Sequence, residues 1–159
     1  MGSTLCLGSS AVVRYSYRSA SAVLQLTVSR IERAPSADVK QLGLKAKETD
    51  GKTLYYVRGS VTVVRSSAMK IFGFDPFGQV GLQVSGGGRA TTYLGYDPDK
   101  CKGVDIDDDA VRPGATSPGC RYFLVDSGAL PSHVTYTNLD DIEKGPITDE
   151  DRISWYEKP

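Results

Sequence analysis

Two long segments of this 159-residue chain alternate apolar and polar side chains with a period of two, the pattern of a β-strand with one buried face. In residues 53–65, one face carries Tyr55, Val57, Val61 and Val63. In residues 22–31, one face carries Ala22, Leu24, Leu26 and Val28. Such alternation is typical of antiparallel strands that have one face in the core and the other in water.

Shorter segments extend this all-β pattern. Strands are also expected at residues 11–17, 70–74, 79–85, 90–94, 120–125, 132–137 and 153–157, separated by Gly, Pro, Asp and Ser clusters that favour turns. Helical signals are confined to residues 36–42 and 138–143, which are too short for the crossovers of a parallel sheet. We therefore predict an all-β protein, an antiparallel β-sandwich with at most one or two short helical turns.

The length of the chain fits one domain, so residues 1–159 are expected to form a single β-sandwich. Residues 1–7 are expected to be a frayed end or a replaced start, and residues 138–159 an acidic C-terminal extension that can add a last strand. No apolar run approaches the roughly 18 residues of a membrane-spanning helix. The start lacks the basic and apolar regions of a signal peptide, so we expect an exported form to be a mature one.

The charges cancel over the whole chain but are unevenly distributed. Residues 1–100 hold 13 Lys/Arg and 7 Asp/Glu, whereas residues 101–159 hold 6 and 12. A net charge of zero argues against nucleic-acid binding through bulk charge. The acidic residues gather in segments 97–109 and 140–151, which predicts an acidic loop surface on a mildly basic body. This arrangement permits weak head-to-tail self-association that salt would reduce.

The three cysteines point to one disulfide. Cys101 and Cys120 bracket a flexible segment rich in Asp, Pro and Gly, and closing it would stabilise the fold by about 3 kcal/mol. We predict this bridge, and with it an oxidising compartment; the alternative is two buried thiols in a cytosolic protein. Cys6 is then a free thiol or an intermolecular partner. Because no Cys-x-x-Cys pair occurs and His133 is the single histidine, a structural zinc site is not expected.

Several motifs together resemble a known family. They are residues 28–33, Gly51-Lys52-Thr53-Leu54-Tyr55-Tyr56-Val57-Arg58, Arg112-Pro113-Gly114, residues 120–125 and Val134-Thr135-Tyr136. The chain resembles the immunoglobulin-like domains, of the telokin-like or immunoprotective extracellular group, in secreted proteins and lipoproteins of actinobacteria. The resemblance implies an immunoglobulin-like sandwich and export, with lipid anchoring in many members, and it carries over no catalytic residue. Residues 72–96 and those after 136 do not match the family pattern.

The acidic run at residues 105–109 offers the strongest hint of a metal site. Asp105, Asp107 and Asp109 repeat the spacing of the first three ligands of an EF-hand. Ala110 stands where that motif needs Gly, however, and Thr116 stands where it needs a bidentate Glu. We therefore predict a solvated acidic loop with no metal and no cofactor, and keep a calcium-stabilised domain as an alternative.

The sequence offers no clear catalytic constellation. His133 is the sole imidazole, so a Ser–His or Cys–His pair would have to form around it. No Gly-x-Ser-x-Gly elbow leads into a helix, and nothing places two carboxylates across a cleft. We therefore predict that the protein is not an enzyme and has no catalytic residues.

An aromatic group offers a candidate contact surface. Phe72 and Phe74 fall on one face of an expected strand, and Phe77 follows Pro76 in a turn. Core packing is the simpler interpretation. The alternative is that these aromatic side chains, beside the triglycine loop at 86–88, present an edge that binds a partner.

These features predict an exported, non-enzymatic binding or structural module, located outside the cell or at the cell envelope. Recognition would use loops around residues 72–89 and 97–119 on a rigid scaffold. The expected partner is a protein or an envelope component, not a nucleic acid, and a longer precursor could carry a lipid anchor. The alternative from another class is an extracellular enzyme or inhibitor whose site is assembled from distant residues.

Overall fold

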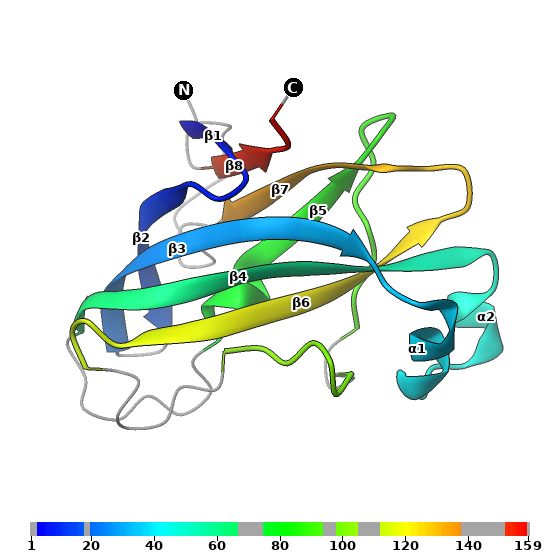
Figure 1. Cartoon of the computed structure of the whole chain (residues 1–159), viewed down its shortest axis with the longest axis horizontal. Helices are drawn as coiled ribbons and strands as arrows, with labels where there is room; N and C mark the ends of the chain where they lie inside the picture. Colours follow the sequence, from blue (N-terminus) through cyan, green and yellow to red (C-terminus); the bar gives the residue numbers. More distant parts are fainter. Residues whose placement is uncertain are drawn as a thin grey trace.

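Two four-stranded sheets face each other in the computed structural model, which describes residues 3–17, 20–66, 75–93, 98–104, 112–137 and 152–158 (Figure 1). Sheet A has the strand order β1 (Ser3–Cys6), β8 (Arg152–Tyr156), β7 (Pro131–Thr137) and β5 (Val80–Val84). Sheet B has the order β2 (Ser10–Tyr17), β3 (Ala20–Arg33), β4 (Lys52–Ser66) and β6 (Thr116–Asp126). The helices are short: α1 (Ser36–Gln41), α2 (Ala46–Thr49) and the 3₁₀ helix η1 (Pro76–Gln79).

The predicted immunoglobulin-like β-sandwich is confirmed. The two strongest period-two segments are β3 and β4, which pair with each other in antiparallel register. Their apolar faces point between the sheets, where Leu24, Leu26, Val57 and Val61 are buried. Helix α1 lies where a helical turn was expected, and α2 is an additional turn at the same end of the sandwich (Figure 1).

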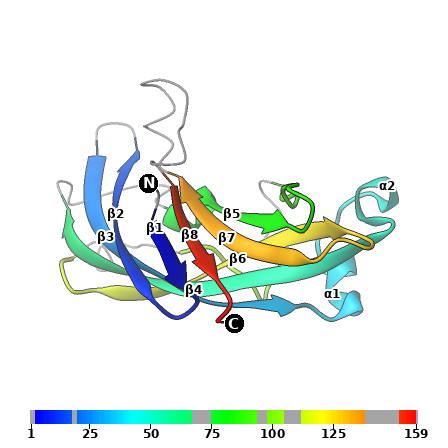
Figure 2. The ribbon, with the colours of Figure 1, turned by 90° about the horizontal axis from the view of Figure 1, so that it is seen from above.

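The two ends of the chain meet in sheet A, where β1 and β8 form a parallel pair (Figure 2). The prediction that residues 1–7 form a frayed end is therefore wrong for Ser3–Cys6. Leu5 packs against the core, and the Leu7 amide donates to the Tyr156 carbonyl at 2.8 Å. The expected last strand is confirmed as β8, and it is no peripheral extension, because Trp155 is fully buried and its indole N–H donates to the Ser9 carbonyl at 2.9 Å.

In the described part of the expected strand at residues 90–94, which ends at residue 93, the chain forms an isolated bridge and no strand. Arg89 pairs with Gln83 of β5, and Thr91 pairs with Leu124 of β6. The chain moves from the edge of one sheet to the edge of the other within these residues, so it can form only isolated bridges. It thereby covers part of the open edges of β5 and β6. The strand expected at 70–74 and the helical turn expected at 138–143 lie outside the described residues.

Phe77 packs into a notch in sheet B that two glycines create. Gly59 and Gly119 are cross-strand partners in β4 and β6. A Cβ atom on Gly59 would lie 2.8 Å from the Phe77 ring, and one on Gly119 would lie closer still. An aromatic ring can cover such glycines only because they carry no side chain.

Arg121 of β6 secures the turn that presents Phe77. Its Nη1 donates to the carbonyl of Gly78 and to that of Val80, the latter at 2.7 Å. The guanidinium thus satisfies carbonyl groups at the end of η1 that have no partner within so short a helix. The start of β5 is thereby tied to sheet B.

This packing corrects one predicted contact residue. Phe77 is fully buried between the sheets, so its side chain is not available to a partner. The core interpretation of Phe77 is confirmed, because its ring lies against the backbone of the paired glycines, where a Cβ atom on Gly119 would clash with it. Phe72 and Phe74 lie outside the described residues.

Replacing Gly119 by alanine should strain this contact. We expect Gly119→Ala to lower the free energy of unfolding by about 1–3 kcal/mol, the usual cost of overpacking a well-filled core. Urea unfolding followed by tryptophan fluorescence would measure it. Gly78→Ala is the matched control, because a Cβ there meets only Asp75 at an ordinary 3.5 Å. Equal stability of the two variants would contradict the notch, whereas partial rescue of Gly119→Ala by Phe77→Leu would support it.

Candidate functional site

A second apolar cluster lies on the outer face of sheet B, at the end near the helices. Because side chains alternate along a strand, β4 and β6 turn every second residue away from the core between the sheets. The outward residues meet α1 and the segment 98–104. The buried members of this cluster are Ala34, Leu42, Leu54, Tyr56, Cys101, Cys120, Tyr122 and Leu124.

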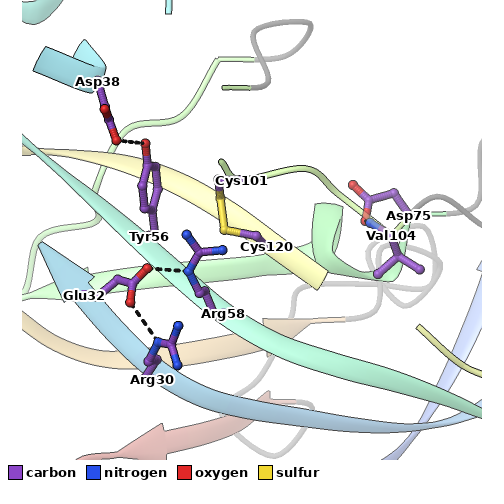
Figure 3. Close-up of a disulfide and its surroundings, with 9 residues drawn as sticks. All are labelled: Arg30, Glu32, Asp38, Tyr56, Arg58, Asp75, Cys101, Val104 and Cys120. Atoms are coloured by element: carbon purple, nitrogen blue, oxygen red, sulfur yellow. Dashed lines mark hydrogen bonds and ion pairs between the residues drawn. A yellow bond between two sulfur atoms is a disulfide. The ribbon is translucent and has the colours of Figure 1, made fainter. Parts of the chain in front are cut away.

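The predicted disulfide between Cys101 and Cys120 is present at the centre of this cluster (Figure 3). The two Cα atoms are 4.9 Å apart, and both residues are buried. The Cys120 amide also donates to the Lys102 carbonyl at 3.0 Å. The bridge therefore fixes segment 98–104, which has no regular secondary structure, against strand β6. Cys6 is a free, half-buried thiol.

A buried carboxylate holds Lys100, the residue before the disulfide. The side chain of Asp38, on α1, is only 2% exposed and accepts from Lys100 Nζ at 2.9 Å and from the Tyr56 hydroxyl at 3.0 Å. The Lys100 ammonium keeps the pKa of Asp38 below its usual range. Burial, together with the hydrogen bond to this carboxylate, raises the pKa of Tyr56 to about 12. The network ties α1, β4 and segment 98–104 together.

A second carboxylate holds Arg58 of β4. Glu32 accepts from Arg58 Nε with one oxygen and from Arg30 Nε with the other, the latter at 2.8 Å (Figure 3). The Arg58 hydrogen bond keeps the pKa of Glu32 below its usual range. The Arg58 guanidinium also lies 5.2 Å from the centre of the Tyr56 ring. Charge and stacking together fix where Arg58 points.

Arg58 and segment 98–104 border a cleft of about 380 Å³ beside the disulfide. Its lining consists of Arg58, Asp99, Lys100, Lys102, Gly103, Ser117, Pro118, Gly119 and Cys120. Three of these side chains are cationic and one is a carboxylate, so we call it the basic cleft. Pro118 has no N–H to donate, so it blunts the edge of β6 at this point.

Asp75 secures the far end of segment 98–104. Its carboxylate accepts from the Val104 amide at 3.3 Å. A Cβ on Gly103 would lie 2.7 Å from Asp75 Oδ2, so a larger residue at 103 would displace the Asp75 carboxylate from its present position. Burial raises the pKa of Asp75. The segment is thus held by an ion pair, a disulfide and a backbone hydrogen bond.

The other residues singled out in the sequence do not converge on one site. His133 lies on the outer face of sheet A, where it stacks on Tyr156 at 4.5 Å and its Nδ1 lies 3.1 Å from the Ser132 hydroxyl. Burial lowers the pKa of His133. Among the described residues, no carboxylate contacts its ring.

The predicted acidic loops lie mostly outside the described residues. Asp99 borders the basic cleft, but Asp105, Asp107 and Asp109, and the acidic residues of 140–151, lie outside the described residues. In the part of the chain that the structure describes, no three His, Cys, Asp or Glu side chains gather where they could bind a metal ion. No described helix is both long and apolar enough to span a membrane.

Sequence reasoning missed the cationic residues of the basic cleft, although a signal for part of it was available. Lys100 and Lys102 flank Cys101, so the predicted disulfide already implied that they lie beside β6. Arg58 falls on the outward face of the strongest predicted strand. The pairing register of β4 with β6, which sets Arg58 opposite Cys120, was the missing information.

The low pKa of Asp38 should make stability depend on pH. A carboxyl group whose folded-state pKa lies below its unfolded value of 3.8 stabilises the fold above that pH and loses the effect as pH falls further. We expect Asp38→Asn to be less stable than wild type at pH 6, with a smaller difference at pH 2.5, in urea unfolding. Asp126→Asn, which removes an exposed pair with Lys52, is the control and should change little. A constant difference across this range would contradict the prediction.

Asp75 should change the pH dependence of stability in the opposite direction to Asp38. Its raised pKa means that folding penalises the charged carboxylate, so wild type loses stability as pH rises from the unfolded value of 3.8 through the folded-state value. Asparagine keeps an acceptor for the Val104 amide without the charge. We expect Asp75→Asn to melt above wild type at pH 7 and close to it at pH 3, by calorimetry. A lower melting temperature at pH 7 would refute this.

Comparison with known proteins shows what the fold resembles. No protein-family model and no curated protein sequence matches the chain. Among solved structures, the chain is similar to MPT63, a secreted protein from Mycobacterium tuberculosis, with a TM-score of 0.61 and 20% identity. The match covers 98% of this chain and 98% of that one. The likeness therefore extends from end to end, and it concerns the fold.

Proposed function

We propose that this protein is an exported, non-enzymatic binding module that works outside the cell or at the cell envelope. The observation that carries the proposal is the buried Cys101–Cys120 disulfide, because such bridges persist in oxidising compartments and are rare in the cytosol. The similarity of the whole fold to a secreted protein supports the same compartment. The partner would be a protein or a component of the envelope.

Segment 98–104 is the part of the molecule best suited to recognition. It is a loop without regular secondary structure, yet Asp38, Asp75 and the disulfide hold it at three points. A loop fixed in this way loses little conformational entropy when it binds. This segment forms part of the lining of the basic cleft, which favours binding at this side of sheet B over the outer face of sheet A.

A non-enzymatic role is consistent with the surroundings of His133. In the described residues its neighbours are an aromatic ring and a hydroxyl, whereas a general base is normally oriented by a carboxylate or a carbonyl. The rival proposal, an extracellular enzyme, would need a residue outside the described ones to complete such a site.

The compartment can be tested through the thiols. When the native gene is expressed in its own host, we expect the protein outside the cytosol, with alkylation under denaturing, non-reducing conditions labelling Cys6 alone. The double variant Cys101→Ser/Cys120→Ser should lose about 3 kcal/mol of unfolding free energy, and Cys6→Ser far less. A cytosolic protein with three reactive thiols would overturn the proposal.

A further inference from the structure

Only the Nε atom of the Arg58 guanidinium donates a hydrogen bond to a described residue. Its side chain is 28% exposed, and its Nε is committed to Glu32. Within the described residues, no hydrogen bond from its two Nη groups is found, although a guanidinium carries five N–H donors. Figure 3 shows the Arg58 guanidinium on the side of the disulfide, where it borders the basic cleft. Guanidinium groups that bind a carboxylate or a phosphate frequently do so with two parallel N–H donors.

Two lysines border the same cleft from segment 98–104. Lys100 is fixed by the buried carboxylate of Asp38, which lies behind it. Lys102 is exposed and forms no ion pair with any described residue. The disulfide and the Asp38 contact thus place both lysines in the lining that also contains Arg58. Glu32 and Asp38 balance the charges of Arg58 and Lys100, so Lys102 is the lining cation without an ion-pair partner among the described residues, and its charge would attract an anion.

We propose that the basic cleft binds the oxyanion group, a phosphate or a carboxylate, of the ligand that this module recognises. The proposal rests on the proposed binding function and specifies the chemical group of the ligand that the cleft would bind. The free edge of the Arg58 guanidinium is planar and matches two oxygens of a phosphate or carboxylate, which a lysine cannot do. Lys100 and Lys102 supply further N–H donors, and Ser117 supplies a hydroxyl.

The size and charge of the cleft limit what it accepts. A volume of about 380 Å³ is small among the volumes of ligand-binding sites. The cleft therefore suits one anionic group and a few neighbouring atoms of the molecule that carries it. Asp99 is the one carboxylate of the lining, and it is exposed. It opposes the bound anion, so removing its charge should strengthen binding.

Titration of ¹⁵N-labelled protein by NMR tests the proposal, with sodium phosphate in one series and sodium succinate in the other. Sodium chloride keeps the ionic strength constant. We expect saturable shifts of the backbone amides of Gly103, Ser117 and Gly119. Saturation by phosphate alone identifies a phosphate-bearing ligand, by succinate alone a carboxylate, and by both an oxyanion site in general. Linear shifts in both series, equal to those caused by chloride, would overturn the proposal.

Variants distinguish binding by specific side chains of the cleft from nonspecific attraction by positive charge. We expect Arg58→Lys, which keeps the charge but loses the fork, to weaken binding about tenfold. Lys102→Gln should weaken it about two- to fivefold, and Asp99→Asn should tighten it about twofold. Lys47→Gln, at an exposed position on α2, is the matched control and should change nothing. An equal effect of Lys47→Gln and Lys102→Gln would overturn the proposal.

The outcomes distinguish this inference from the function on which it rests. Lys102 and Asp99 are exposed, so their variants test the cleft even where Arg58→Lys disturbs folding through the loss of its Glu32 contact. A cytosolic protein that still binds phosphate or succinate would overturn export and keep the oxyanion site. An exported protein that binds neither anion would overturn the oxyanion site alone.

Discussion

The absence of side chains at Gly59 and Gly119 is the constraint on which much of this molecule depends. It lets the ring of Phe77 lie directly against the backbone of sheet B. Arg121 then binds the carbonyls that follow the ring, so the chain enters β5 at a fixed place and sheet A is set against sheet B. Asp75, two residues before Phe77, is positioned by the same turn and reaches the Val104 amide, so the packing between the sheets also fixes one end of the loop over the basic cleft.

Sheet B carries apolar clusters on both faces, and the two differ in what they can do. The inner cluster joins the two sheets. The outer cluster is small and bordered by ions, with Asp38 holding Lys100 and Glu32 holding Arg58. Each carboxylate lowers the cost of bringing a cation to the protein surface in a fixed orientation. The sandwich core supplies stability, and the outer cluster supplies a positioned set of charges.

The elements that sequence could predict are those with a local signal. Period-two alternation is sufficient to predict β3 and β4, and the Asp-, Pro- and Gly-rich sequence between Cys101 and Cys120 is sufficient to predict their bridge. The pairing of β1 with β8 has no local signal, since its partners lie at opposite ends of the chain. Gly59 looked like an ordinary strand residue and Phe77 like a turn residue, because their contact depends on the register of other strands. The basic cleft was missed for the same reason: Arg58 and Lys102 meet only once β4, β6 and the disulfide are in place.

The position of β8 between β1 and β7 also determines when the molecule can be completed. Every strand of sheet B is contained in residues 10–126, so that sheet can pair fully while the rest of the chain is still being made. Sheet A, in contrast, lacks an interior strand until Tyr156 is available, and β1 has no neighbour in its sheet before then. A chain that has been synthesised or carried across a membrane only as far as Thr137 can pair β5 with β7 over sheet B, but it leaves exposed the part of the core that Trp155 closes.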